Sequence, residues 1–432
     1  MSSVKIIAFH LTQFHPIPEN DRWWGEGFTE WTNVVRGRPF FPGHRQPQLP
    51  GELGLYDLRQ DAVRAAQRSL AQQFGIDGFC YYYYWFGGKR LLEQPVDAML
   101  AGGEPNLPFC LCWANENWTR RWDGKDQEIL IAQQHSPEDD IAIARDLIRH
   151  FHDSRYIRID GRPVMIVYRI DLLPEPLATV ARWRDECRRA GIGEIYLWTV
   201  RRFGMPDPER YGFDALVDFP PHGCVAAEVT RATKGVAEEF SGRIFDYRDL
   251  VRDALSRGGG RLPNFRCVMP SWDNTARKGT RAHVFHGATP LRYRAWLAET
   301  VKGAAEDVTL PQPMVFINAW NEWAEGCHLE PDADYGNAWL DATRAARDDA
   351  TADDRLWTRF GTGLPALSDE EERRLAGAPL DTVLNALQGV TCADVRPTIF
   401  ERLIAMARRQ FERWPAAHRA VLPFARWFGL AD

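Results

Sequence analysis

The chain has 432 residues, a formal net charge of −6 at pH 7 and 12% aromatic residues. This length suffices for one barrel of about 250 residues or more together with an appendage. The acidic balance offers no basic footprint, so nucleic acid is excluded as an expected partner.

The cysteines and the N-terminal segment indicate a reduced, cytoplasmic protein. Cys80, Cys110, Cys112 and Cys267 lie inside apolar runs, where a free cysteine behaves as a small hydrophobic residue. The N-terminus lacks the basic start and apolar core of a signal peptide. No apolar stretch reaches the roughly 18 residues that a membrane span needs, so we expect no transmembrane segment.

Short apolar runs rich in Val, Ile, Phe and Tyr alternate with longer amphipathic stretches. The apolar runs predict eight strands: Val4–Phe9, Ile76–Tyr83, Pro108–Trp113, Pro163–Tyr168, Glu194–Val200, Ala215–Phe219, Phe265–Met269 and Met314–Ala319. The amphipathic stretches predict helices at Asp61–Phe74, Glu138–Phe151, Leu177–Arg189, Tyr247–Arg257, Leu291–Ala305 and Ala338–Arg347. Strand-then-helix alternation is typical of parallel βαβ units, and eight units predict an α/β fold, a closed (β/α)₈ barrel of the TIM type.

An open doubly wound sheet is the alternative fold. It favours a Gly-rich phosphate turn after the first strand, and the residues at 10–13, His-Leu-Thr-Gln, do not form one.

Polar or aromatic residues follow nearly every predicted strand, whereas the strand starts are ordinary. Barrel enzymes place their active sites at the carboxyl ends of the strands, so these residues are predicted to line a substrate cleft. From the first seven strands the predicted substrate-binding residues are His10, Gln13, Tyr82, Tyr84, Trp113, Asn115, Asn117, Trp118, Trp198, Asp218, His222, Trp272 and Asp273.

Two segments lie outside the barrel pattern. The long segment Ile17–Arg59 carries Trp31, a further predicted substrate-binding residue, because loops of this length are usually functional. After about Ala350 the strand pattern stops, which predicts a barrel domain at 1–350 and a helical extension at 351–432. The extension is predicted to contain helices at Asp381–Leu387 and Thr398–Arg413.

A basic, aromatic stretch lies near the C-terminus. We interpret it as the solvated face of a small helical cap, with peripheral contact to an anionic membrane surface or a protein partner as the alternative. Its residues are Arg408, Arg409, Arg413, Trp414, Arg419, Arg426 and Trp427.

The eighth predicted strand turns abruptly into two carboxylates, Glu322 and Glu325, between tryptophans. Paired carboxylates beside indole rings suit acid/base attack on a sugar, because indole faces stack on pyranose rings and carboxylates transfer protons. One carboxyl must hold a proton at neutral pH and the other must not. Glu116, which follows Asn115, is a rival for one of the two roles, since paired carboxylates usually come from different strands. The predicted sugar-binding residues of this segment are Trp320, Asn321 and Trp323.

Other motifs point away from metal, acyl-transfer and nucleotide chemistry. The histidines show no strong metal-ligand spacing, and Asp332-Ala333-Asp334 is interpreted as a loop despite its likeness to a metal–nucleotide motif. Neither a Gly-x-Ser-x-Gly elbow nor a Gly-x-x-x-x-Gly-Lys phosphate loop occurs. We therefore expect no metal and no cofactor.

Three motifs together resemble a known family. They are Trp113 to Gly124, Tyr81 to Phe86 and Asn321 to Gly326, and they look like the WbsX-type polysaccharide-biosynthesis proteins, also described as glycoside hydrolase family 99-like domains. The resemblance covers about Val4 to Arg347. It implies a (β/α)₈ barrel and an association with O-antigen-like surface polysaccharides.

The resemblance also implies roles for the two carboxylates. Enzymes of family 99 are endo-acting, retaining α-mannosidases with a motif close to Asn-Glu-Trp-His-Glu-Gly. On that motif Glu322 falls on the carboxylate that deprotonates the sugar 2-hydroxyl, and Glu325 on the general acid/base. The 2-oxygen then attacks the anomeric carbon, so no enzyme nucleophile is needed. This sequence departs from the motif at Ala324, Cys327 and His328, which puts mannose specificity in doubt.

Three hypotheses of function follow. The first is a glycoside hydrolase, endo-acting, that cleaves a bacterial surface polysaccharide or its precursor with Glu325 as acid and Glu322 or Glu116 as its partner. The second is a glycosyltransferase of polysaccharide biosynthesis. The third is a catalytically silent glycan-binding barrel, whose affinity for a saccharide would not change in a Glu325→Gln variant.

Overall fold

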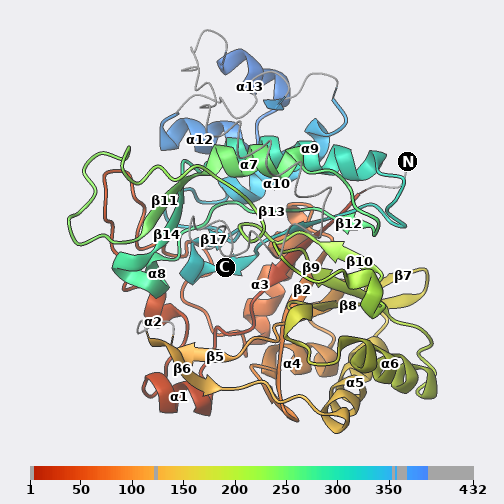
Figure 1. Ribbon diagram of the computed structural model, residues 1–432. Helices are drawn as coiled ribbons and strands as arrows, with labels where there is room; N and C mark the ends of the chain where they lie inside the picture. The colour runs from red at the N-terminus through yellow and green to blue at the C-terminus, as the bar shows by residue number, and fades with distance from the viewer. Residues whose placement is uncertain (1–3, 121–124, 353–355, 358–366, 388–432) are drawn as a thin grey trace.

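The computed structural model describes residues 4–120, 125–352, 356–357 and 367–387, and its centre is a parallel sheet closed into a (β/α)₈ barrel (Figure 1). The sheet runs in the order β12-β10-β9-β8-β4-β2-β1-β15-β13. Its strands are β1 (Lys5–His10), β2 (Gly78–Phe86), β4 (Phe109–Trp113), β8 (Arg162–Val167), β9 (Tyr196–Val200), β10 (Ala215–Val217), β12 (Asn264–Phe265), β13 (Cys267–Val268) and β15 (Met314–Ile317). The predicted barrel is confirmed.

The seventh predicted strand, Phe265–Met269, differs from the prediction because it is divided at Arg266. Its first half, β12, pairs with β10, and its second half, β13, pairs with β15. The side chain of Arg266 contacts Asp218 at 3.3 Å and donates to the Arg257 carbonyl at 2.6 Å, while its own carbonyl accepts from Phe316. By pairing with a different neighbour on each side of Arg266, this short segment closes the barrel.

The first and last strands of the barrel are also neighbours. Lys5 lies opposite Met314 and Ala8 opposite Ile317 in the parallel β1–β15 pair. Side chains on such strands alternate between the two faces. Phe9 contacts Phe316 and other rings inside the barrel, whereas its neighbour His10 contacts Gln67 on the surrounding helix α3.

Helices cover the outside of the barrel. They are α3 (Asp61–Gln73), α4 (Gln94–Gly102), α5 (Pro137–Phe151), α6 (Pro176–Arg189), α7 (Tyr247–Ser256), α9 (Pro290–Glu306) and α10 (Ala338–Asp349). Six of these confirm predicted helices, and α4 was not predicted. After β9 the short turn η3 (Pro208–Tyr211) takes the place of a helix.

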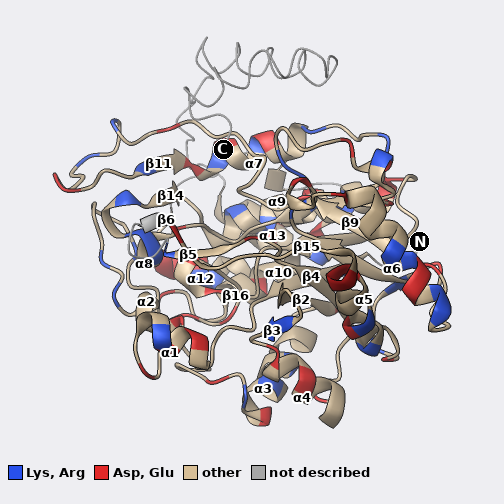
Figure 2. Cartoon of the chain, turned by 60° about the horizontal axis from the view of Figure 1, so that its bottom comes forward, with Lys and Arg blue, Asp and Glu red and all other residues tan. Residues whose placement is uncertain are grey.

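Helix α5 illustrates how local sequence fixes these boundaries. Ser136 caps its N-terminus by accepting a hydrogen bond from the Asp139 amide, and Pro137 occupies the first turn, where no amide donor is needed. Acidic residues lie in its first turn and Arg149 in its last, which complements the helix dipole. Basic and acidic residues are interspersed along the outer helices α5 and α6 (Figure 2).

Several small elements decorate the barrel. Two short helices, α1 (Pro18–Trp24) and α2 (Trp31–Val34), lie in the long segment that was predicted as a loop. Further strands outside the barrel include β3 (Lys89–Leu91), β5 (Trp118–Arg120), β6 (Lys125–Ile131), β7 (Arg158–Ile159), β11 (Arg243–Asp246) and β14 (His283–His286). Residues 121–124 of the predicted motif lie outside the described residues.

Beyond the barrel, α12 (Asp369–Ala376) and α13 (Leu380–Ala386) lie on the side of α9 and α10, at the top of Figure 1. Leu375, Val383 and Leu384 form a separate apolar cluster with Leu291 and Ala295 of α9. The predicted helix at 381–387 is confirmed within one residue. The division at 350 and 351 stays a prediction, and the predicted helix at 398–413, with the basic stretch, lies outside the described residues.

Within the described part of the chain, no helix is both long and apolar enough to cross a membrane.

Candidate active site

The turn after β15 carries the two predicted catalytic carboxylates. A short antiparallel pair, β16 (Asn321–Glu322) and β17 (Cys327–His328), brackets the single turn η5 (Trp323–Glu325). Gly326 ends that turn at φ 55°, and a Cβ there would lie 2.8 Å from the Gln48 amide nitrogen. Glycine is therefore required to close the turn that sets Glu325 beside Glu322.

A single arginine holds both carboxylates. Arg277, on the short helix α8 (Thr275–Lys278), places Nη2 2.6 Å from Glu322 and Nη1 2.9 Å from Glu325. Its Nε lies 2.9 Å from a third carboxylate, Glu30. We call Arg277, Glu30, Glu322 and Glu325 the arginine cluster.

The two carboxylates differ in their surroundings. The Glu322 side chain is 8% exposed and that of Glu325 is 21% exposed. Burial is the largest cause that raises the pKa of Glu322 well above its usual range, and the charges of Glu325 and Glu30 raise it further, whereas Arg277 opposes them. The inner carboxyl is thus desolvated and held by a cation, and the outer one is more accessible to a substrate.

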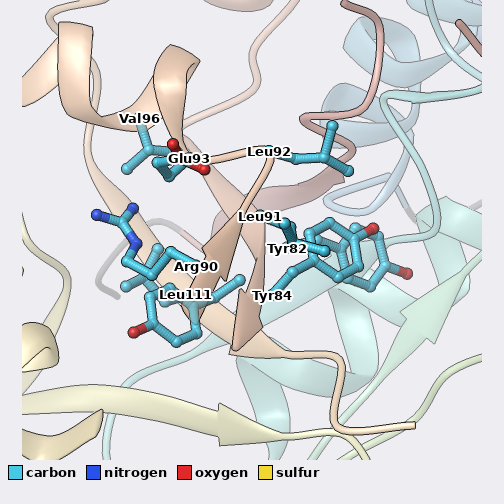
Figure 3. A pocket seen from close by; sticks show the side chains of 9 residues that line it. Tyr82, Tyr84, Arg90, Leu91, Leu92, Glu93, Val96 and Leu111 are labelled. Carbon is cyan, nitrogen blue, oxygen red and sulfur yellow. The ribbon is translucent and has the colours of Figure 1, made fainter. Parts of the chain in front are cut away.

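Tyr82 and Tyr84 of β2 lie on the same side of the strand, away from Arg90 (Figure 3). Burial, followed by the negative charge of Glu322, raises the pKa of both phenols, which places both within electrostatic reach of that carboxylate. The Tyr84 hydroxyl lies 3.4 Å from Gln13, and the Gln13 amide donates to Glu30 at 2.6 Å. The predicted residues Gln13, Tyr82 and Tyr84 are therefore brought together with the carboxylates.

A cavity of about 10 Å³ lies behind these tyrosines, between β2, β3 and α4 (Figure 3). It holds no more than about one water molecule and none of the predicted catalytic carboxylates lines it. The site is therefore defined by the arginine cluster and not by this cavity.

Tyr168, which follows β8, connects the cluster to Glu116. Burial is the main cause that raises its pKa, followed by the charge of Glu116, and the charge of Glu325 also contributes. Glu116 is partly exposed and accepts a hydrogen bond from Arg169 at 2.8 Å. Glu116 and Glu325 thus both lie within electrostatic reach of the Tyr168 phenol.

Six predicted substrate-binding tryptophans are buried in the protein interior. Their exposed fractions are 6% or less, and their rings contact other aromatic rings, as Trp198 does with Phe265 at 4.0 Å. A ring buried to this extent has little face to offer to a sugar, so we assign these six residues to packing. They are Trp31, Trp113, Trp198, Trp272, Trp320 and Trp323.

Other predicted residues make hydrogen bonds that hold the framework of the site. Asn321 binds the backbone of Leu11 in both directions, at 2.8 and 3.1 Å, and Asn115 does the same to Arg169 at 2.8 and 2.7 Å. His10 contacts Gln67 at 3.2 Å, and burial lowers its pKa to about 4, which leaves it neutral at pH 7.

Two predicted aspartates are likewise committed to protein donors. Asp218 contacts Arg266 at 3.3 Å, where the seventh strand divides. Asp273 accepts from His44 and Gln46, each at 2.7 Å, and from the Thr275 amide at 3.0 Å, which fixes the start of α8.

The remaining predicted residues lie on the more accessible side of the barrel end. Asn117 is exposed and Trp118 is half-buried, with its ring edge-to-face against Tyr84 at 5.2 Å. His222 is half-buried and lies 6.3 Å from the rings of both Tyr168 and Trp272. Trp118 and His222 are thus connected to the arginine cluster through Tyr84 and Tyr168.

Two residues of the arginine cluster were not predicted from the sequence. Arg277 follows the seventh strand by nine residues, and Glu30 lies inside the long segment after the first strand. Neither residue stands at the exit of a barrel strand: Glu30 is the N-cap residue of α2, and Arg277 lies in α8. The charges at these two short helices are the signal in the sequence that points to them.

Comparisons with known proteins agree with this architecture. A family model described as "Glycosyltransferase WbsX" matches residues 6–343. Two Xanthomonas campestris pv. campestris proteins, each described as "Uncharacterized protein WxcX", are 51% identical over 341 residues, which is 79% of this chain and 49% of theirs. The chain therefore spans about half the length of the curated relatives it matches.

Solved structures share the fold. A glycoside hydrolase-like protein aligns with a TM-score of 0.50 and 16% identity, over 81% of this chain and 94% of its own. A GH99 endo-alpha-mannosidase from Bacteroides thetaiotaomicron aligns with a TM-score of 0.50 and 15% identity, over 80% of this chain and 97% of its own. At these identities the likeness extends to the fold.

Proposed function

This chain belongs to the WbsX family, and from the geometry of its site we propose that it is a glycoside hydrolase of a bacterial surface polysaccharide, O-antigen-like, or of its precursor. The motif resemblance adds endo-cleavage to the proposal. The observation that carries it is the pair Glu322 and Glu325, held on one guanidinium at the carboxyl end of the barrel with one member buried and the other accessible.

The two carboxyls divide the work by their exposure. Glu325, the accessible member, donates its proton to the glycosidic oxygen as the bond to the anomeric carbon breaks. Glu322, the buried member, takes the proton of the sugar 2-hydroxyl, whose oxygen forms the new bond to that carbon. Water then attacks the anomeric carbon and breaks its bond to the 2-oxygen. Glu325 takes a proton from the water, and Glu322 returns its proton to the 2-oxygen, so both carboxyls regain their starting forms. Glu116 hydrogen-bonds the substrate in this scheme, since Arg169 already occupies one of its oxygens.

The aromatic residues around the cluster bind the sugar. Tyr82 and Tyr84 present phenols on the Glu322 side, and Tyr168 lies within electrostatic reach of Glu325. Phenol rings combine an apolar face for the pyranose ring with a polar edge for its hydroxyls.

Product analysis by mass spectrometry tests the proposal. The protein is incubated with a panel of bacterial surface polysaccharides in the absence of any nucleotide sugar. We expect new oligosaccharides whose yield falls by about 10²–10⁴-fold in a Glu325→Gln variant, because general acid catalysis contributes about that much. The exposed Glu239→Gln variant is the matched control, and an unchanged rate in Glu325→Gln would remove Glu325 from the acid role.

A glycosyltransferase is the second candidate, favoured by the description of the family that the chain matches. It predicts that no oligosaccharide appears from the panel until a nucleotide- or lipid-linked donor is added. Transfer under those conditions alone would replace the hydrolase proposal. Saccharide binding without any product, and unaffected by Glu325→Gln, would instead identify a silent glycan-binding barrel.

A further inference from the structure

Glu30 is a buried carboxylate whose two oxygens both face protein donors. Its side chain is 1% exposed. One oxygen accepts from Arg277 Nε at 2.9 Å and from Asn33 at 3.1 Å, and the other accepts from Gln13 at 2.6 Å. A carboxylate so engaged is placed to hold Arg277 and not to bind a substrate.

The backbone that carries Arg277 is fixed from the same part of the chain. Asp273 accepts from the amide of Thr275 at 3.0 Å and so organises the first turn of α8. The donors on its other oxygen, His44 and Gln46, come from the long segment after β1 that also supplies Glu30. Both the side chain and the backbone of Arg277 are therefore positioned by that segment.

The arginine cluster holds more negative than positive charge. The elements α2, α8 and η5 pack against one another around it. The titratable groups that face it from β2, β17 and the end of β8 are Tyr82, Tyr84, Cys327 and Tyr168. Burial is the main cause that raises the pKa of each of these four, so they are neutral at pH 7 and three carboxyls share one guanidinium.

We propose that Arg277 and Glu30 are positioning residues with opposite electrostatic effects on the catalytic pair. Arg277 holds Glu322 and Glu325 through separate nitrogens. Glu30 orients Arg277, and its negative charge opposes the loss of protons from the pair. The inference rests on the proposed function, since it assigns the pair to acid/base work. An opposite charge within about 4–6 Å favours the ionised carboxylate, and a like charge favours the protonated carboxyl. Arg277 therefore lowers, and Glu30 raises, the pH at which the pair loses its protons.

The pH dependence of turnover tests this assignment. In a Glu30→Gln variant both limbs of the kcat–pH profile are expected to move to lower pH, by about one unit or more, because a repelling negative charge is gone. In an Arg277→Gln variant both limbs are expected to move to higher pH by a similar amount. We expect kcat to change more than KM, since neither residue contacts the sugar. A purely structural role would lower activity without opposite shifts.

A second measurement does not depend on activity. A carboxyl whose pKa is raised in the folded state stabilises the protein fully below its ordinary pKa, and that stability is lost as the pH rises through the folded value. Burial raises the pKa of Glu322 in this way. Between pH 5 and 9, the melting temperature of Arg277→Gln should fall more steeply than that of the wild type, and that of Glu30→Gln less steeply.

Two exposed residues outside the site serve as controls. Glu239→Gln and Arg38→Gln remove members of an exposed ion pair, at 50% and 62% exposure, and should move neither the limbs nor the melting slopes. Should Arg277→Gln fail to fold, Arg277→Lys keeps the charge, and its limbs should stay near the wild-type values while kcat falls. Shifts of Glu30→Gln and Arg277→Gln in the same direction, or none, would overturn the inference. Opposite melting slopes without turnover on any glycan would support the charge assignment and overturn the hydrolase.

Discussion

Successive tyrosines of β2 show that a shift of one residue along a strand determines whether a side chain faces the arginine cluster or packs on the outside of the barrel. Tyr84 lies on the side of Glu322 and Gln13, whereas the Tyr83 hydroxyl donates to Asp146 of α5 at 2.9 Å on the outer side of the barrel. The alternation of a strand places adjacent side chains on opposite faces, so only every second residue of the run can reach the cluster.

A Tyr84→Phe variant should therefore lose turnover. Removal of the hydroxyl takes away a neutral donor beside Glu322, and we expect kcat to fall about tenfold or more, in line with about 1.4 kcal/mol or more of lost transition-state stabilisation. The rate of oligosaccharide release measures this. Tyr83→Phe is the matched control on the same strand, and an equal loss in both variants would show that the effect is structural.

Asn321 is expected to stabilise the fold through its hydrogen bonds to the backbone. Its amide satisfies both the backbone N–H and the C=O of Leu11, and all of these groups are buried. Asn321→Ala leaves two buried backbone groups without partners, which we expect to cost about 2–5 kcal/mol. Urea unfolding measures the loss. Asn117→Ala, at an exposed position, should lower the free energy of unfolding by less than about 1 kcal/mol. Equal losses in both variants would contradict a stabilising role for the buried Asn321–Leu11 hydrogen bonds.

At the scale of elements, a barrel strand is predictable where it is buried on both faces. The eight predicted strands are all present because a strand with helices outside and packed rings inside is a continuous apolar run. The division of the seventh strand at Arg266 was not predicted, since it depends on pairing with β10 and β15, which no local pattern encodes. Helix α4 escaped prediction because its residues, at 94–102, lack a clear amphipathic period.

One buried ion pair connects the helices beyond the barrel to α9 and α10. Arg294 of α9 is 1% exposed, binds Asp349 through two nitrogens at 2.6 and 2.8 Å, and donates to the carbonyls that end α12. Arg294→Met leaves the buried Asp349 without its cationic partner, which we expect to lower the free energy of unfolding by about 3–5 kcal/mol.

Hydrogen exchange locates this effect. We expect the amides of α12 and α13 to exchange faster in Arg294→Met. The amides of β1 and β2 should change only by as much as the global unfolding free energy of the variant changes. Arg210→Met, at 81% exposure, is the control and should cost less than about 1 kcal/mol. Unchanged exchange in α12 would show that its docking does not depend on Arg294.

At the scale of the whole molecule, the sequence predicted that Glu322, Glu325 and the tyrosines meet at one end of the barrel but not how the charges there are arranged. Glu322, Glu325, Tyr82 and Tyr84 meet there, because parallel strands bring their carboxyl ends together. The balancing residue Arg277 depends on a three-dimensional contact between segments that are distant in sequence. The buried tryptophans show the converse limit, because a motif identifies an aromatic ring but not the direction in which it points.

Glu330 gives the molecule a measurable pH dependence. It is fully buried and accepts from Tyr56, Gln67 and Trp323 at 2.6–2.8 Å, and burial is the main cause that raises its pKa to about 7. The folded pKa lies above the ordinary value of 4.5, so its contribution to stability is full below pH 4.5 and is lost as the pH rises through 7.

We therefore expect unfolding free energy to fall by up to about 3 kcal/mol between pH 5 and 8 through this group, at about 1.4 kcal/mol per pH unit. Denaturant unfolding at several pH values measures it. A Glu330→Gln variant is less stable overall, because an amide nitrogen now faces hydrogen-bond donors, but its decline over this pH range should be smaller. An identical decline would assign the pH dependence to other groups.

The pairing of β1 with β15 has a consequence for how the protein is made. Lys5 lies opposite Met314, so the edge of β1 that pairs with β15 has no partner strand until more than 300 residues have been synthesised. At about 5–20 residues per second, that interval on the ribosome lasts on the order of 15 to 60 seconds. Glu322 and Glu325 follow β15 within one short turn, so the nascent chain acquires the proposed catalytic pair in the same step that completes its barrel. An unfinished chain has an open sheet edge and lacks that pair.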